Sequence, residues 1–193
     1  RPSVDRRQPD VRVEAYFTFD HVSFYIDLAG ESLFKRGWRL EHGEAPLKEN
    51  LAAALLMLSG WTAGKPLVDP FCGSGTIAIE AAAMATNTAP GLNRHFDFEH
   101  LEGFDMALWR EMKEDARAAR NMHAKVRIEA HDISSIVVEK AVENARRAGF
   151  GALIDDGGIV FSQGDAREVR PPEGAEPGLV IATPPYGEQS NPK

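Results

Sequence analysis

The segment from Asp69 to Thr76 carries the residue types and spacing that most clearly predict chemistry. It reads D-P-F-C-G-S-G-T and follows a short apolar stretch. Glycines after a strand let the backbone approach a ligand closely, and the helix that follows offers free N–H groups to it. The segment lacks the P-loop and dinucleotide spacings, which disfavours triphosphate and dinucleotide ligands. The candidate ligand-binding residues are Asp69, Pro70, Cys72, Gly73, Ser74, Gly75 and Thr76.

Two aspartates follow later predicted strands. Asp132, with Ile133 after it, follows the strand expected at 126–130, where a carboxylate can accept hydrogen bonds from both hydroxyls of a ribose. Asp165, with Ala166 after it in a G-D-A segment, ends the strand expected at 158–162 and can accept a hydrogen bond from an adenine amino group. These residues extend the candidate site toward a nucleoside.

A proline-rich loop, T-P-P-Y, follows the strand expected at 178–182. Two prolines fix the backbone and remove two N–H donors, which leaves carbonyl oxygens free to accept hydrogen bonds. An adjacent aromatic ring offers a stacking surface for a base, which would have to leave its stack to enter. Such a loop can hold a planar amine beside an electrophilic methyl group, and positioning supplies much of the rate. The candidate catalytic residues are Thr183, Pro184, Pro185 and Tyr186.

Each motif also has a purely structural interpretation. The glycine segment can be a plain strand-to-helix turn, and the proline loop can simply end a strand. Asp132 can cap a helix, and Asp165 can be a turn residue. The functional interpretation is favoured because all four motifs occur together at predicted strand ends.

The elements that must position these motifs follow a regular pattern. Strands alternate with helices from Pro66 onward, which predicts an α/β fold with a parallel, doubly wound sheet. Ligands bind beyond the carboxyl ends of the strands in such sheets. A hairpin, split by Asp20-His21, precedes this region. The expected strands are 11–19, 22–28, 66–69, 126–130, 158–162 and 178–182, and the expected helices are 46–59, 76–86, 105–123 and 136–148.

Composition limits the classes of protein that this chain can represent. A single cysteine excludes an internal disulfide and a multi-cysteine zinc site, and the six histidines show no metal spacing. No apolar run is long enough to span a membrane, and no secretory signal is visible, so we expect a cytoplasmic protein.

The formal net charge of −7 is unusual for an enzyme that binds nucleic acid, because such proteins usually present a basic face to the phosphates. Positive charge is local, and its residues are either solvated surface groups or contacts to RNA. If the substrate is RNA, much of its binding surface should lie outside this chain. The local clusters are Arg6, Arg7 and Arg12, then Lys35, Arg36 and Arg39, and then Arg146 and Arg147.

The order of these motifs resembles the amino-directed Rossmann methyltransferases. The best match is the THUMP-linked RNA methylase family, and within it the bacterial enzymes that methylate guanine N2 of 23S ribosomal RNA. Further segments carry the resemblance: G-E-S-L-x-K-R-G-W-R at 30–39, P-L-K-E-x-L-A-A-A at 46–54, A-P-G-L-x-R at 89–94 and N-A-R-R-A-G at 144–149. It implies S-adenosylmethionine as methyl donor, with Gly73 and Gly75 near its methionine end, Asp132 at its ribose and Asp165 at its adenine. The loop from Thr183 to Tyr186 would hold the target amine.

The resemblance also implies a domain organisation and partners. Residues 1–40 would be the last hairpin of a THUMP domain and a linker, and residues 41–193 the first part of a Rossmann-like class I methyltransferase domain. The family's sheet continues beyond the proline loop, so we expect an incomplete sheet here. The expected partners are RNA, with ribosomal RNA favoured, and the remainder of a larger chain or assembly. No metal and no membrane are expected.

Two departures from the family pattern affect the expected activity. Thr183 stands where the family has Asn or Asp, so one acceptor for the amine would be misplaced and turnover reduced. Ser134 stands where an acidic residue is common, which would weaken cofactor binding. Two alternatives therefore stay open: a methyltransferase acting on adenine N6 of DNA or RNA, and a catalytically impaired module that binds S-adenosylmethionine or RNA.

Overall fold

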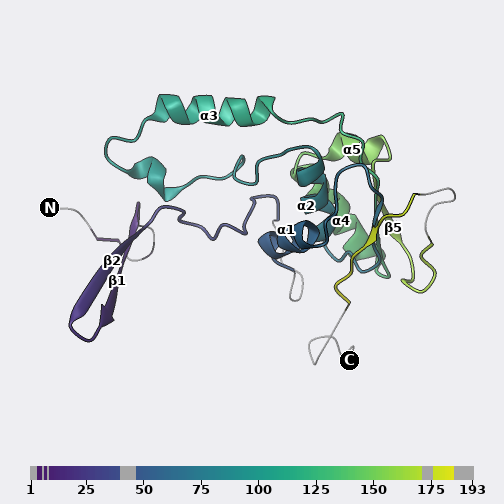
Figure 1. The fold of residues 1–193 in the computed structure, drawn as a ribbon, viewed down its shortest axis with the longest axis horizontal. Helices are drawn as coiled ribbons and strands as arrows, with labels where there is room; N and C mark the ends of the chain where they lie inside the picture. The colour runs from purple at the N-terminus through teal and green to yellow at the C-terminus, as the bar shows by residue number, and fades with distance from the viewer. Residues whose placement is uncertain (1–3, 6, 8, 40–46, 171–175, 185–193) are drawn as a thin grey trace.

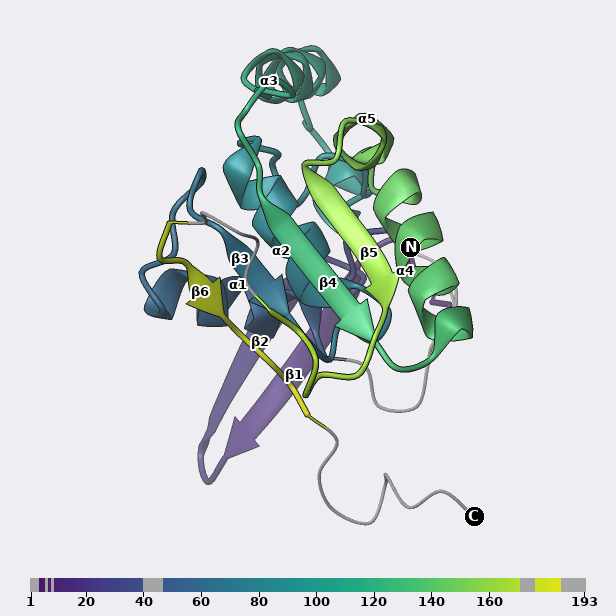
Figure 2. The same ribbon diagram turned by 90° about the vertical axis from the view of Figure 1, so that its right-hand side faces the viewer.

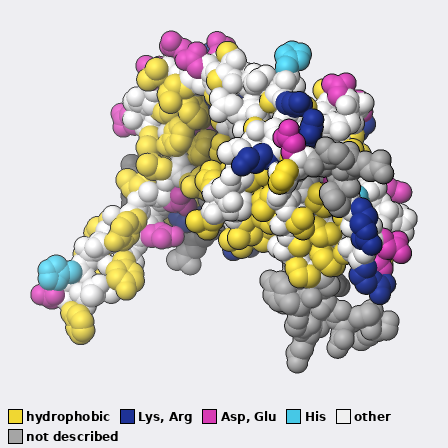
Figure 3. Space-filling view, turned by 45° about the vertical axis from the view of Figure 1, so that its right-hand side comes forward, with side chains coloured by type: hydrophobic (Ala, Val, Ile, Leu, Met, Phe, Trp, Pro, Cys, Tyr) yellow, Lys and Arg dark blue, Asp and Glu magenta, His cyan; other side chains and the backbone are white. Residues whose placement is uncertain are grey.

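A computed structural model describes residues 4–5, 7, 9–39, 47–170 and 176–184. The chain begins with an antiparallel hairpin of β1 (Arg12–Thr18) and β2 (His21–Asp27), in which Arg12 pairs with Asp27 and Thr18 with His21. This hairpin projects from one end of the molecule (Figure 1). It carries exposed hydrophobic side chains (Figure 3); Phe17 and Phe24 are among the exposed ones. The predicted hairpin is confirmed.

The second sheet has four parallel strands in the order β5-β4-β3-β6. They are β3 (Leu67–Asp69), β4 (Ile128–Asp132), β5 (Ile159–Gln163) and β6 (Leu179–Val180). The chain moves outward from β3 to β5 and then returns to the other side of β3. This reversal is the topological switch point of a doubly wound sheet, where ligands bind beyond the carboxyl ends. The predicted α/β fold with a parallel sheet is confirmed.

Three helices cover one face of this sheet (Figure 2): α1 (Glu49–Leu58), α2 (Thr76–Ala85) and α4 (Ser135–Arg147). The α2 helix is almost entirely apolar and buried because it lies between the sheet and the other two helices, and its charged Glu80 pairs with Arg36. Among the residues that the structure describes, no helix covers the opposite face (Figure 2). The core is formed by Leu56, Leu67, Ile77, Ile79, Ile128, Phe150 and Ile159, with smaller residues between them.

A long excursion between α2 and β4 lies outside these layers (Figure 1). It contains the 3-10 helix η1 (Asp97–His100) and the helix α3 (Met106–Ala118). The Trp109 ring packs edge-on against Phe96 and Phe98, at centroid distances of 5.9 and 5.1 Å. The buried Arg94 donates to backbone carbonyls of the segment that follows the hairpin, including those of Ser32 and Ala29 at 3.1 Å each. The excursion therefore binds this segment rather than the sheet.

Some boundaries differ from the predicted ones. The β4 strand extends to Asp132 because it pairs with β5 as far as Gln163. The α3 helix ends at Ala118 rather than at 123, and β6 has only two residues. A short helix, α5 (Gly151–Asp155), was not predicted, since five residues after a glycine give little periodic signal.

Candidate active site

The glycine turn and the end of β4 are joined by hydrogen bonds at one edge of the sheet. The Gly73 N–H donates to Asp132 Oδ2 at 3.1 Å, and the Cys72 N–H donates to the His131 carbonyl at 2.8 Å. The other carboxylate oxygen of Asp132 accepts from the Ser134 N–H at 3.0 Å. Each oxygen keeps a further lone pair. The carboxylate can therefore orient the turn and still accept hydrogen bonds from a ligand.

The two glycines of the turn are subject to different steric constraints. Both have positive φ, +52° at Gly73 and +85° at Gly75. A Cβ at Gly75 would lie 3.1 Å from the Ala141 Cβ and 3.3 Å from the Phe161 ring, so this position is closely packed. A Cβ at Gly73 would meet no atom of the described residues within 4 Å. Gly73 therefore faces open space in which a ligand can approach the backbone.

Asp69 is a buried carboxylate behind the turn, only 1% exposed. Its Oδ1 accepts from the Phe71 N–H at 3.1 Å, whereas its Oδ2 has no hydrogen-bond partner among the described residues. Burial, and secondarily the negative charge of Asp132, raise the pKa of Asp69 to about 7. A buried carboxylate oxygen without a partner is unfavourable, and a donor or a positive charge on a bound ligand would relieve it.

The end of β5 is attached to the same edge, because the Gly164 N–H donates to the Asp132 carbonyl at 3.0 Å. Both carboxylate oxygens of Asp165 bind the exposed Arg167, whose Nη2 lies 2.5 Å from Oδ2 and whose Nε lies 3.0 Å from Oδ1. Hydrogen bonding from Arg167 lowers the pKa of Asp165 to about 2. Arg167 thus competes for the carboxylate that was predicted to accept from adenine.

For the remaining predicted site residues, the structure gives only their burial and the strand that they follow. The Ile181 N–H donates to the Val68 carbonyl at 3.0 Å, so the chain beyond β6 leaves from the same edge. Thr183 is half-buried there and Pro184 is exposed, while Pro185 and Tyr186 lie outside the described residues. Pro70, Ser74 and Ala166 are half-buried, Thr76 is buried, and Ile133 is exposed.

Burial raises the pKa of the Cys72 thiol, followed by the charges of Asp69 and Asp132. The thiol is therefore unreactive, and Cys72 acts as a small buried residue of the turn.

Sequence reasoning missed the residues that hold the turn from behind. The Arg39 guanidinium donates to the Ser74 and Thr76 hydroxyls at 2.6 Å each, and Asn144 Nδ2 donates to the Ser74 carbonyl at 3.0 Å. Both residues belong to segments quoted for the family resemblance, at 30–39 and 144–149. Neither segment lies at a predicted strand end, although both match the family pattern. This combination is the signal that could have indicated a role in supporting another part of the molecule.

The interpretation of Arg36 and Arg39 as surface cations or RNA contacts is wrong. Their side chains are 15% and 6% exposed. Arg36 pairs with Glu80 at 3.2 Å, and Arg39 pairs with Glu49 at 3.0 Å. Local sequence could not reveal this, because both acidic partners lie on helices further along the chain.

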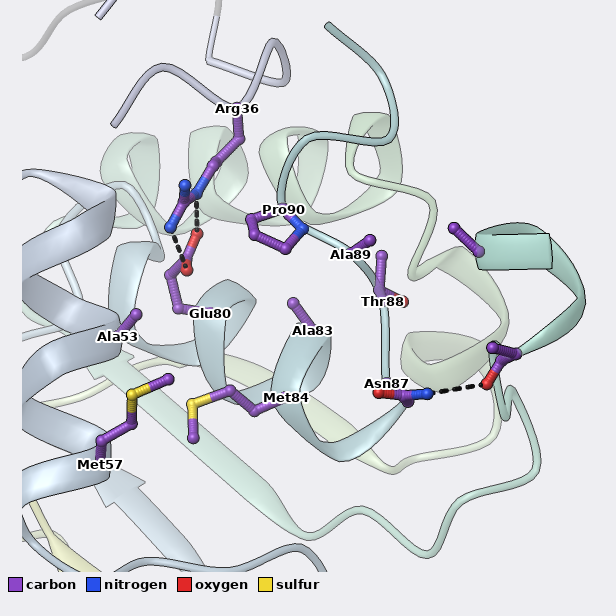
Figure 4. A pocket seen from close by; sticks show the side chains of 12 residues that line it. Arg36, Ala53, Met57, Glu80, Ala83, Met84, Asn87, Thr88, Ala89 and Pro90 are labelled. Atoms are coloured by element: carbon purple, nitrogen blue, oxygen red, sulfur yellow. Dashed lines mark hydrogen bonds and ion pairs between the residues drawn. The ribbon is translucent and has the colours of Figure 1, made fainter. Parts of the chain in front are cut away.

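A cavity of about 330 Å³ lies on the helical side of the molecule, away from the strand ends (Figure 4). Met57 and Met84 line it with several alanines, and the Arg36–Glu80 pair borders it. No predicted site residue lines it. Within the described ranges there is no cluster of three or more metal-binding side chains. In that same part of the chain, no helix is long and apolar enough to cross a membrane.

Residues 36–193 match the family model of the RMKL-like methyltransferase domain. The chain belongs to this family. It is 45% identical over 193 residues to a ribosomal RNA large subunit methyltransferase K/L from Photobacterium profundum, covering 98% of this chain. It spans about a quarter (26%) of that relative's length.

Solved structures agree with this membership. The crystal structure of SMU.472 complexed with SAH (S-adenosylhomocysteine) is 39% identical, with a TM-score of 0.82. A predicted N6-adenine-specific DNA methylase from Listeria monocytogenes str. 4b F2365 is also 39% identical, with a TM-score of 0.83. Each comparison covers 92% of this chain and 45% of the other. The Rossmann-like methyltransferase fold is therefore established for this chain.

Proposed function

We propose that this chain binds S-adenosylmethionine and serves a cytoplasmic ribosomal RNA methyltransferase whose target is guanine N2 of 23S RNA. The observation that carries the proposal is the bond between Gly73 and Asp132, which joins the glycine turn to the end of β4. The family, the SAH complex of a relative and the ribosomal RNA substrate named for another relative support it.

The residues at the strand ends fit this cofactor, whose sulfonium supplies the methyl group. We call residues 69–76 the cofactor turn. The open space at Gly73 would admit the methionine end, and the unpartnered oxygen of Asp69 would suit a donor or positive charge of the ligand. Asp132 would hold the ribose with its remaining lone pairs. Asp165 would accept from adenine once Arg167 moves aside.

The loop from Thr183 to Tyr186 would hold the target amine next to the cofactor. Its carbonyl oxygens would accept the amine hydrogens, and Tyr186 would stack on the base. Guanine N2 and adenine N6 are both exocyclic ring amines, so the loop chemistry suits either base. The name of the Listeria relative keeps adenine N6 of DNA as the competing substrate. We favour RNA because the relative that matches 98% of this chain is named for ribosomal RNA.

We further propose that residues 1–40 are the last hairpin of a THUMP domain and a linker, and that residues 41–193 begin the methyltransferase domain. The exposed hydrophobic side chains of β1 and β2 support the first part, because an isolated hairpin is only marginally stable. RNA contacts would then come largely from surfaces beyond the described residues.

The experiment that tests the function measures methyl transfer from labelled S-adenosylmethionine to 23S ribosomal RNA, transfer RNA and DNA in parallel. Modified nucleosides are then identified by mass spectrometry. We expect N2-methylguanosine in 23S RNA alone, and none with Asp132→Asn, whereas Asp156→Asn, at an exposed residue just after α5, retains activity. N6-methyladenine as the main product would support the competing substrate. Cofactor binding without transfer to any of the three would indicate an impaired module.

A further inference from the structure

The linker segment, residues 30–39, lies along α2 and contacts two successive turns of that helix. Arg36 binds Glu80, with Nε and Nη2 at 3.2 and 3.3 Å from the two carboxylate oxygens (Figure 4). Arg39 binds Thr76, four residues earlier on the same helix. Residues 76 and 80 share one helix face, so the linker is fixed to α2 at two points, one of which is the cofactor turn.

Arg39 uses all three of its guanidinium nitrogens to hold this position. Its Nη1 donates to Ser74 Oγ and its Nη2 to Thr76 Oγ1, at 2.6 Å each. Its Nε donates to Glu49 Oε1 at 3.0 Å, which balances the charge in a place where neither side chain is more than 6% exposed. The planar fork of arginine fixes both hydroxyls in one geometry.

The same part of the turn is held from a second direction. The Asn144 side chain donates to the Ser74 carbonyl at 3.0 Å and accepts from Arg147 Nη2 at 2.6 Å. Arg147 Nε in turn donates to the Trp38 carbonyl at 3.1 Å. A closed ring of contacts therefore runs from the linker through the cofactor turn to α4 and back to the linker. Ser74 is fixed at both its hydroxyl and its backbone.

We propose that Arg39 is a positioning residue that sets the affinity of the cofactor turn for S-adenosylmethionine. The inference rests on the proposed function, since it assumes that this turn binds the cofactor. Thr76 is buried and Ser74 is half-buried, and Arg39 reaches both from the side of the linker. Its bonds therefore fix the shape of the turn, and with it the Gly73 backbone that faces the space proposed for the ligand.

The test compares the two linker arginines in the full chain, by calorimetric titration with S-adenosylhomocysteine. Arg39→Lys keeps a positive charge beside Glu49 but cannot fork to both hydroxyls. We expect it to weaken binding by about tenfold, because bonds from a charged donor are lost. Arg36→Lys is the matched control, since it disturbs the other buried ion pair without touching the turn. We expect its affinity to stay within about twofold of the unmodified chain.

A double-mutant cycle separates positioning from general loss of structure. Ser74→Ala and Arg39→Lys should be non-additive in affinity, because each removes the same contact. Thermal unfolding of each variant checks that it is folded at the titration temperature. Equal affinity of Arg39→Lys and Arg36→Lys, or full additivity in the cycle, would overturn the inference alone. An unmodified chain that binds no S-adenosylhomocysteine would overturn the proposed function first.

Discussion

The cofactor turn and the end of β6 lie at the same sheet edge but are held very differently. The turn receives hydrogen bonds from Arg39 and Asn144 and donates one to Asp132, so three separate segments fix it. The strand β6 has two residues and, within the part of the chain that the structure describes, pairs only with β3, and Val180 is 69% exposed. The described residues thus preorganise the side proposed for the cofactor, whereas the side proposed for the amine depends on one short strand.

This difference separates two properties that are often treated as one. Cofactor affinity should be a property of the chain itself, because the described contacts that shape the turn come from residues between 39 and 144. Turnover should respond to whatever else stabilises β6 and the proline loop, since edge strands readily pair with further chain. Variants on the two sides should therefore change different measured quantities.

The largest effect is expected from Asp69 and concerns stability. The pKa of Asp69 is raised from 3.8 to about 7 in the folded state. Between these values the folded chain holds a proton that the unfolded chain releases, so the free energy of unfolding falls as pH rises through this range. A shift of this size corresponds to about 4 kcal/mol at most. Asp69→Asn should be more stable than the unmodified chain at pH 8, with the difference vanishing near pH 4.

Urea unfolding at pH 4, 6 and 8 measures this dependence. The Phe71 N–H keeps an oxygen acceptor in the variant, so the turn should survive the change. A variant whose stability relative to the unmodified chain does not vary with pH would show that Asp69 ionises normally.

Asp132 should give the largest change in cofactor affinity. Asp132→Ala removes an acceptor from Gly73 and from Ser134, as well as the proposed ribose contact. Each lost bond to a carboxylate is worth about 1.5–3 kcal/mol, so we expect S-adenosylhomocysteine to bind about a hundredfold more weakly. Calorimetric titration against Asp156→Ala, an exposed acidic control, checks this. Similar affinities for the two variants would place the cofactor elsewhere.

The two turn glycines should separate stability from binding. Gly75→Ala places a Cβ 3.1 Å from Ala141 at φ +85°, so it should lower the free energy of unfolding by about 2–3 kcal/mol. The Cβ of Gly73→Ala meets no atom of the described residues, so this change should lower the free energy of unfolding by only about 1 kcal/mol. Its Cβ enters the space proposed for the ligand, however, so it should weaken S-adenosylhomocysteine binding when both variants are assayed folded. Unchanged affinity in Gly73→Ala would contradict the proposed cradle.

The smallest effect is expected on the amine side. Thr183→Asn restores a side-chain carbonyl oxygen that reaches further than the threonine hydroxyl. We expect turnover to rise severalfold, in line with about 1 kcal/mol for one better-placed hydrogen bond. Cofactor affinity should be unchanged, and Thr183→Val should not raise turnover. A gain in cofactor affinity without a gain in turnover would argue that Thr183 does not face the amine.

The sequence predicted the sheet well because its signals are local. Apolar stretches such as Ile128–Ala130 end at residues with distinct turn chemistry, and the glycine turn leads directly into a helix. It did not predict the support of the site, because the partners are distant in the chain: Arg39 binds Ser74 across 35 residues, and Asn144 binds the same residue across 70. At Asp165 the sequence did not reveal that the side chain of its neighbour Arg167 binds both carboxylate oxygens in the folded chain.

Hydrogen exchange of the full chain, with and without S-adenosylhomocysteine, tests most directly where the cofactor binds. Protection should increase at residues 69–76, 132–134 and 164–166, which lie at the ends of three adjacent strands. The helix α3 and the cavity beside Met57 should be unaffected. Protection confined to the cavity, or no protection at the strand ends despite measurable binding, would contradict the placement of the cofactor at the switch point of the sheet.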